Sequence, residues 1–167
     1  MKSLRKYSQE KQEIIHQSLK VTWQEAQQYC KSTGKRLPTE AEWEVAAKGG
    51  KEIIYSWGNE VQSEKANFCD HHCEKRWNAK QFKDGFETTA PVGSFPPNGY
   101  GLYDMGGNVY EWVFDWYGKE YYRHSPTKNP TGPSTGKYKV MRGGSWINYA
   151  VGTRPNDRTD AQPGKRL

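Results

Sequence analysis

The chain has 167 residues, a length that suits one domain, and hydrophobic residues make up only 34% of it. The net charge of +6 is spread along the chain rather than gathered in one stripe, which argues against nucleic acid as a partner, and no run of about 18 apolar residues is present to span a membrane. A mean hydropathy of -1.07 would permit disorder, but 7 Trp, 11 Tyr and 5 Phe predict an ordered, loop-rich α+β domain.

Residues 1–20 form a polar leader that is rich in Lys and Gln. This leader has basic residues but no apolar stretch, so it does not have the pattern of a signal peptide. The chain as written is therefore expected to stay in the cytoplasm. An exported location is expected instead if the chain is a fragment of a longer protein.

A first helix is expected after the leader, because Thr22 and Glu25 have the spacing of a capping box. Gly34 supplies a residue that ends helices. The apolar positions of this helix fall on one face and are Trp23, Ala26, Tyr29 and Cys30.

A second helix is expected close behind it, because Thr39 and Glu42 repeat the capping-box spacing. Gly49 and Gly50 are expected to end the helix. The residues expected on its apolar face are Trp43, Val45, Ala46 and Ala47.

Residues 51–139 break into short segments that are separated by turn motifs such as KDGFE, PPNGYG and MGGN. So many turns predict short strands and long loops. The stretch KYKVMRGGSW then predicts a strand that ends in a Gly-Gly kink, and the polar tail over residues 154–167 is expected to end without a closing element.

The stretch GLYDMGGNVYEW follows neither helical nor strand periodicity. Asp104 and Glu111 bracket two glycines and Asn108, and flexible backbone between carboxylates suits Ca²⁺, which takes about 6–8 oxygen ligands. The alternative is a tight turn that leads into a buried strand, with Tyr110 and Trp112 in the core. Asp84 in KDGFE is a weaker metal candidate, since an Asp before Gly also caps turns.

A cluster of Cys69, His71, His72 and Cys73 contains residue types that bind zinc. Four donors within five positions cannot easily surround a tetrahedral ion, so a local Cys69–Cys73 disulfide or free thiols are favoured. A cysteine nucleophile paired with His72 is a weaker alternative. Ser145 lacks the G-x-S-x-G elbow of serine hydrolases and is interpreted as part of the kink.

Taken together, several stretches resemble the formylglycine-generating enzyme family, whose members are also called sulfatase-modifying factors. They are RLPTEAEWEVAAKGG, YSWGNE, ANF, TAPVGSFPPNGYGLYDMGGNVYEW and VMRGGSW, and the resemblance extends over residues 21–167. It implies a compact α+β fold related to C-type lectins, with two helices, short strands and many loops.

The resemblance also implies two structural Ca²⁺ sites, each built from two side chains and two backbone carbonyls. The residues that match the first site are Asn67 and Asp84 through their side chains, and Phe68 and Phe86 through their carbonyls. The residues that match the second site are Asp104 and Glu111 through their side chains, and Gly107 and Val109 through their carbonyls.

Active members of the family carry two cysteines after the R-G-G-S motif, and these bind copper(I) and oxidise a substrate cysteine to formylglycine. The matching positions are Asn148 and Thr153, neither of which offers a thiolate, so copper is not expected. Arginines of the family's closing segment match Arg142 and three others. A ligand groove is expected from Asn148, Arg154, Arg158 and Arg166, with a purely structural role as the alternative.

Relative to the family pattern, the domain of residues 21–167 lacks the N-terminal portion and the final G-F-R strand. The sequence therefore predicts a calcium-stabilised, non-catalytic domain that binds a peptide, a protein or a small molecule. The alternative is a formylglycine-generating oxidoreductase that acts on a cysteine of a protein substrate.

Overall fold

The computed structural model describes residues 20–75 and 78–166. The predicted leader lies outside the described residues, apart from Lys20. Two helices, α2 (Trp23–Ser32) and α3 (Glu40–Lys48), precede a sheet of three short strands, β1 (Glu111–Trp116), β2 (Lys139–Arg142) and β3 (Thr159–Ala161). Three 3₁₀ turns complete the regular structure of the described residues: η1 (Ser63–Lys65), η2 (Tyr121–Arg123) and η3 (Ala150–Thr153). The α+β class is confirmed.

Both helices begin where the sequence predicts, because both capping boxes form. The Thr22 hydroxyl accepts a hydrogen bond from the Glu25 amide while the Glu25 carboxylate accepts one from the Thr22 amide. Thr39 and Glu42 repeat the arrangement at the start of α3, and Gly49 ends that helix in the left-handed conformation.

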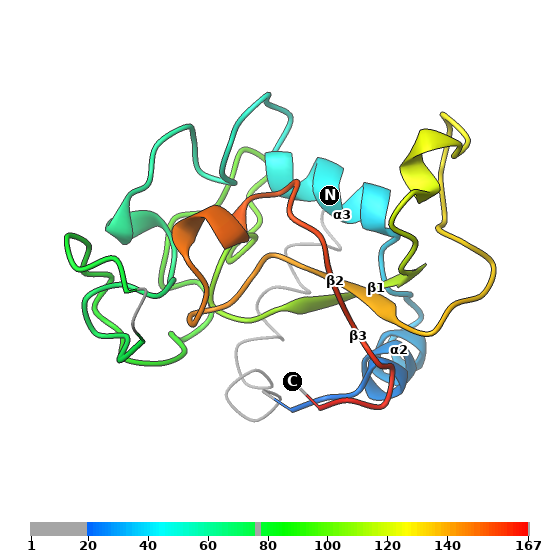
Figure 1. Cartoon of the computed structure of the whole chain (residues 1–167), viewed down its shortest axis with the longest axis horizontal. Helices are drawn as coiled ribbons and strands as arrows, with labels where there is room; N and C mark the ends of the chain where they lie inside the picture. The colour runs from blue at the N-terminus through cyan, green and yellow to red at the C-terminus, as the bar shows by residue number, and fades with distance from the viewer. Residues whose placement is uncertain (1–19, 76–77, 167) are drawn as a thin grey trace.

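The sheet is antiparallel with the order β1-β2-β3, and the two helices cover its opposite faces (Figure 1). Alternation along the strands assigns the side chains to the two faces. Trp112 and Met141 pack with Cys30 of α2, whereas Val113 and Val140 pack with Trp43 of α3.

One predicted core position is wrong. Val45 of α3 is 62% exposed, while its neighbours Trp43 and Ala47 are buried. Val45 lies two residues from each of them, and on a helix such a spacing places a side chain away from the face that they share.

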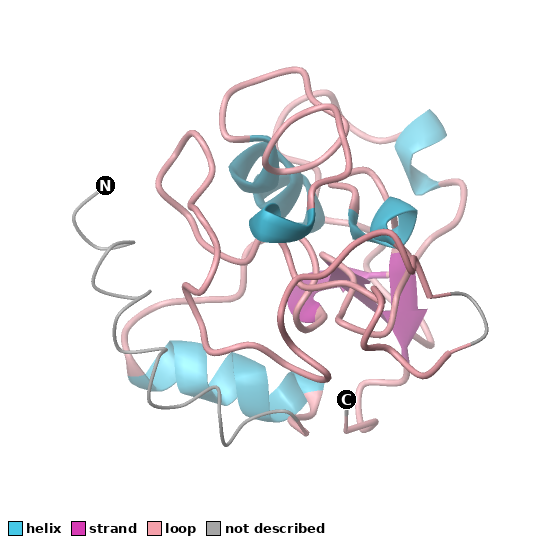
Figure 2. Ribbon diagram, turned by 90° about the vertical axis from the view of Figure 1, so that its left-hand side faces the viewer, coloured by secondary structure: helices cyan, strands magenta, loops and turns pink. Residues whose placement is uncertain are grey.

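Loops make up most of the described chain, as Figure 2 shows. The described residues of the region 51–139 contain β1 and only the first residue of β2. The described part of the region therefore has fewer strands than its turn motifs predict. A small core of its own supports these loops, and it contains Ala66, Phe68 and Ala150.

The strand predicted at residues 137–146 forms as β2 and ends in the expected kink, with φ of +87° at Gly143 and +70° at Gly144. The tail does contain a strand, however, since β3 pairs with β2 through Met141 and Thr159. The sequence pattern did not predict this strand, and residues 162–166, which follow it, form no helix or strand. No helix among the described residues is long and apolar enough to cross a membrane.

Candidate functional site

The loop over residues 104–111 curls through three residues in the left-handed region: Asp104 (φ +56°), Gly107 (φ +80°) and Asn108 (φ +61°). A residue other than glycine costs about 1–2 kcal/mol in that conformation, so the surroundings must hold it there. For Asp104 the support is a hydrogen bond of 2.8 Å from the Gly93 amide to the carboxylate Oδ2.

Glu111 closes this loop at the first residue of β1. Its carboxylate Oε2 accepts a hydrogen bond of 2.7 Å from the indole Nε1 of Trp43 on α3. N–H donors thus orient both Asp104 and Glu111, and an ionised carboxylate offers about four lone-pair sites on its two oxygens. The donor set of two carboxylates and backbone carbonyls fits a hard cation such as Ca²⁺.

The loop also contacts the first predicted site. The Asn108 amide donates to the Asn67 carbonyl at 2.8 Å, and the two side-chain amides share a longer hydrogen bond of 3.4 Å. The Asn108 side chain is fixed by reciprocal bonds with the backbone of Ala90. Both asparagines are at most 2% exposed, so the two predicted sites are joined by a buried polar connection.

Asp84, the carboxylate of the first predicted site, accepts backbone hydrogen bonds from Phe68 at 3.1 Å and from Phe86 at 2.9 Å. These are the residues whose carbonyls the sequence assigns to the same ion. Burial and the nearby negative charge of Asp70 raise the pKa of Asp84 to about 6. A cation at this position would offset that cost of ionisation.

Asn148 lies two residues before η3, and Thr153 is the last residue of η3. The Asn148 Oδ1 accepts from the amide and hydroxyl of Ser145, at 3.0 and 2.6 Å, and its Nδ2 donates to the Tyr110 hydroxyl at 2.8 Å. The Thr153 side chain is fully buried, and its hydroxyl donates to the Ala150 carbonyl at 2.7 Å. Both side chains therefore serve the local fold.

The same geometry bears on Ser145. Its hydroxyl donates to an amide oxygen, which is not a base, and the backbone on its N-terminal side is the Gly143–Gly144 kink. This arrangement agrees with the interpretation of Ser145 as part of a kink rather than a nucleophile.

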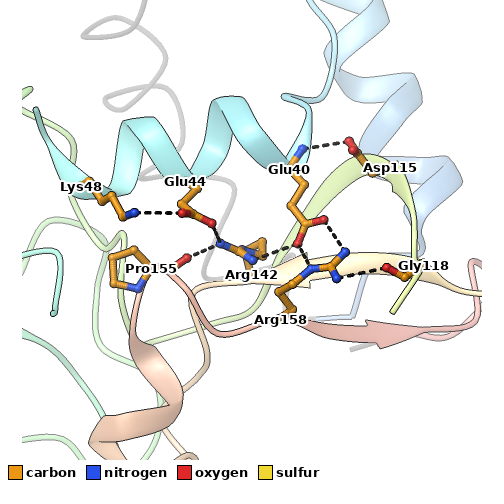
Figure 3. Close-up of polar contacts among 8 residues, drawn as sticks. All are labelled: Glu40, Glu44, Lys48, Asp115, Gly118, Arg142, Pro155 and Arg158. Atoms are coloured by element: carbon orange, nitrogen blue, oxygen red, sulfur yellow. Dashed lines mark hydrogen bonds and ion pairs between the residues drawn. The ribbon is translucent and has the colours of Figure 1, made fainter. Parts of the chain in front are cut away.

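Figure 3 shows that two of the matched arginines converge on Glu40, the first residue of α3. Arg142 is fully buried and binds Glu40 at 2.9 Å and Glu44 at 2.7 Å, as well as the Pro155 carbonyl. Arg158 forms a two-pronged contact with Glu40, at 2.7 and 2.8 Å.

The remaining arginines of the predicted groove lie elsewhere. Arg154 pairs with Asp157 at 2.8 Å, and Arg166 pairs with Glu25 of α2. The structure thus places the arginines in separate ion pairs, an arrangement that favours the structural alternative. The groove itself stays a prediction.

Sequence reasoning missed several buried charged residues, among them Glu40, Asp115 and Lys139. The Asp115 Oδ2 accepts from the Glu40 amide at 2.8 Å, and burial raises the pKa of Asp115 to about 6. The Lys139 ammonium lies 3.9 Å from the ring centre of Trp23 and 4.0 Å from that of Trp116, and burial lowers its pKa to about 8. The places of Asp115 and Lys139 in strands β1 and β2 were the available signal, because both faces of this sheet are covered and every residue of β2 is buried.

Cys69 and Cys73 form a disulfide with their Cα atoms 5.1 Å apart, which is one of the two states that the sequence favours. Cys30 is buried in the core beside the sheet.

Comparison with known proteins places these features in context. The profile of the Sulfatase-modifying factor enzyme 1-like domain matches residues 2–167. The chain is 41% identical to a formylglycine-generating enzyme of Streptomyces coelicolor over 157 residues, which are 89% of this chain and 50% of that protein. It is 44% identical to the mouse formylglycine-generating enzyme, over 80% of this chain and 37% of that protein.

A second mouse protein, inactive C-alpha-formylglycine-generating enzyme 2, is 42% identical over 84% of this chain and 39% of that protein. Among solved structures, PvdO from Pseudomonas aeruginosa matches with a TM-score of 0.70 and 30% identity, over 89% of this chain and 57% of that one. The chain spans half or less of the length of these curated relatives.

Proposed function

The chain belongs to the formylglycine-generating enzyme family, and we propose that it is a calcium-stabilised, non-catalytic domain of that family that binds a ligand. The observation that carries the proposal is the state of Asn148 and Thr153, at the positions that the family resemblance assigns to the copper-binding cysteines. Neither residue offers a soft thiolate for Cu(I), and both side chains are committed to hydrogen bonds within the chain. These residues do not fit copper, so no redox step is assigned to them.

A relative that is named inactive supports the proposal, since the mouse protein of that name is 42% identical to this chain. Identities of 41% and 44% to proteins named formylglycine-generating enzyme favour the alternative, a formylglycine-generating oxidoreductase. The oxidoreductase function needs a pair of thiolates to bind copper(I), whereas the binding function does not.

An oxidation assay distinguishes the two functions. The purified protein is incubated with copper(I), oxygen and a peptide that contains Cys-x-Pro-x-Arg, and the peptide is then examined by mass spectrometry for the aldehyde. We expect no aldehyde above the rate without protein. Aldehyde formed at a rate proportional to protein concentration would refute the non-catalytic proposal.

A gain-of-binding variant provides the matched control. Asn148→Cys combined with Thr153→Cys restores two thiols at the predicted positions. In competition with a copper(I) chelator, we expect this double variant to retain copper and the unmodified chain to retain none. Equal retention by both proteins would show that copper binds elsewhere.

The calcium part of the proposal rests on the two loops. Asp104 and Glu111 are oriented by N–H donors, and Gly107 and Asn108 between them adopt the left-handed conformation. An ion that binds the folded state alone at 100 times its Kd adds about 2.7 kcal/mol to the free energy of unfolding. For a domain of this size that corresponds to a rise in Tm of about 5–11 °C.

The test compares Tm in calcium and in chelator. Glu111→Gln weakens one ligand and is expected to reduce the calcium-dependent rise, while Glu120→Gln, in an exposed ion pair with Arg123 at η2, leaves that rise unchanged. A chain whose Tm is the same with saturating calcium and with chelator would refute the calcium assignment.

The ligand-binding part rests on an exposed apolar surface at η3. Tyr149 and Val151 are each 51% exposed, directly beside Asn148. Tyrosine is enriched at interfaces because its ring offers contact area and its hydroxyl a hydrogen bond. We expect the labelled Cys-x-Pro-x-Arg peptide to bind without being oxidised, and Tyr149→Ser to weaken binding more than Tyr100→Ser, since Tyr100 is 56% exposed at a different loop. An unchanged fluorescence anisotropy at high protein concentration would exclude this peptide as the ligand.

A further inference from the structure

Three potential metal ligands meet beside the disulfide loop: Asp70, His72 and Asp84. One ligand atom from each lies within 4.8 Å of the others, and His72 Nδ1 is 3.5 Å from Asp70 Oδ1. Asp70 is fully buried, while the His72 side chain is one-third exposed. Asp70 and His72 come from the segment between Cys69 and Cys73, and Asp84 comes from the turn that follows Phe82.

Backbone amides orient both carboxylates of the cluster. Asp70 Oδ1 accepts from the His72 amide at 2.8 Å, and Asp70 Oδ2 accepts from the Asp84 amide at 2.5 Å. The two oxygens of Asp84 accept from Phe68 and Phe86. Each oxygen therefore keeps a lone pair for a further partner, and the disulfide limits the motion of the segment that carries Asp70 and His72. Such supporting contacts are what hold metal ligands in place.

The imidazole of His72 is the independent observation. Its Nδ1 is buried without a hydrogen-bond partner, facing the Asp70 carboxylate. Across residues 20–75 and 78–166, no Lys or Arg forms an ion pair with Asp70 or Asp84. A protonated His72 would pair with Asp70 at this distance, whereas a neutral His72 leaves its buried ring nitrogen without a hydrogen-bond partner beside two partly desolvated carboxylates. A bound cation would satisfy the neutral imidazole and both carboxylates.

The chemistry of the donors identifies the class of cation. Calcium takes oxygen ligands, whereas one imidazole nitrogen with two carboxylates suits a borderline ion such as Zn²⁺. Zinc–ligand bonds of about 2.0–2.1 Å place the ligand atoms of a tetrahedral site about 3.3 Å apart, close to the 3.5 Å between His72 and Asp70. We propose that Asp70, His72 and Asp84 bind one divalent zinc-like ion, with a fourth position open to water.

Asp70 and His72 take no part in the predicted calcium sites. Asp84 is common to the zinc site and the first predicted calcium site, so His72 is the residue that separates them. The His72 side chain makes no hydrogen bond in the described structure that its removal would break, and its partial exposure makes His72→Ala a mild change for the fold. The adjacent His71 is exposed and provides the matched control.

The experiment is a Zn²⁺ titration by calorimetry of the untagged, non-reduced chain in calcium-free buffer, because calcium bound at the first predicted site would compete for Asp84. We expect one zinc per chain, at least a tenfold weaker affinity in His72→Ala, and an unchanged affinity in His71→Ala. Circular dichroism confirms the fold of each variant. Failure of the wild-type chain to bind zinc, or equal affinities for wild type and His72→Ala, would overturn the proposal, and neither result would bear on the predicted calcium site of Asp104 and Glu111.

Discussion

The contact between the two predicted calcium loops can be tested at Gly107. A Cβ on Gly107 would lie 2.1 Å from the Asn67 carbonyl oxygen, a distance that no side chain tolerates, and φ there is +80°. Gly101 has nearly the same φ, +74°, but a Cβ on it would meet nothing within 4 Å. The pair of alanine variants therefore separates the cost of the backbone conformation from the cost of the contact.

The expected magnitudes follow from these environments. The left-handed conformation costs alanine about 1–2 kcal/mol at either position. In Gly107→Ala the loops must also move apart, which breaks the bond of 2.7 Å from the Gly107 amide to Gly143 and that of 2.8 Å from Asn108 to Asn67. At about 1 kcal/mol for each lost hydrogen bond, Gly107→Ala should cost about 3–4 kcal/mol.

Urea unfolding at saturating calcium measures both variants under the same conditions. We expect the free energy of unfolding of Gly107→Ala to fall below that of Gly101→Ala by about 2 kcal/mol, the difference contributed by the broken contacts. Equal losses in the two variants would show that the Asn67 loop does not press on Gly107, and the joined arrangement of the two loops would then be refuted.

Three further changes concern the groups around α3. Burial, together with the like charge of Glu40, raises the pKa of Asp115 from 3.8 to about 6, so ionisation of Asp115 opposes folding. The free energy of unfolding should therefore fall by about 3 kcal/mol as the pH rises from about 4 to 6 and beyond. Urea titrations at several pH values should show that Asp115→Asn loses this pH dependence. Arg142→Met should cost about 3–5 kcal/mol in urea unfolding, since it leaves the buried Glu40 with one arginine fewer, and a loss below 1 kcal/mol would contradict this. Trp43→Phe removes the hydrogen-bond donor to Glu111 and should weaken calcium binding in calorimetric titrations. An unchanged calcium affinity would show that this hydrogen bond does not contribute to calcium binding.

Local patterns were the part of this protein that its sequence predicted well. The capping boxes at Thr22 and Thr39 join residues three apart, so they depend on local sequence and not on distant contacts. The Gly143–Gly144 kink likewise depends on backbone freedom at two adjacent positions. The family motifs and the absence of thiols at Asn148 and Thr153 can also be read without a structure.

Tertiary structure alone decided which distant side chains meet. Glu40 binds Arg142, 102 residues away in the sequence, and Arg158, 118 residues away. The loops that separate these residues have no periodicity from which their course through the fold could be predicted. The meeting of His72 with Asp84 has the same origin. Sequence spacing determines contacts within a helix turn or a capping motif, whereas contacts between loops depend on how the whole chain packs, and in this protein the candidate sites lie in loops.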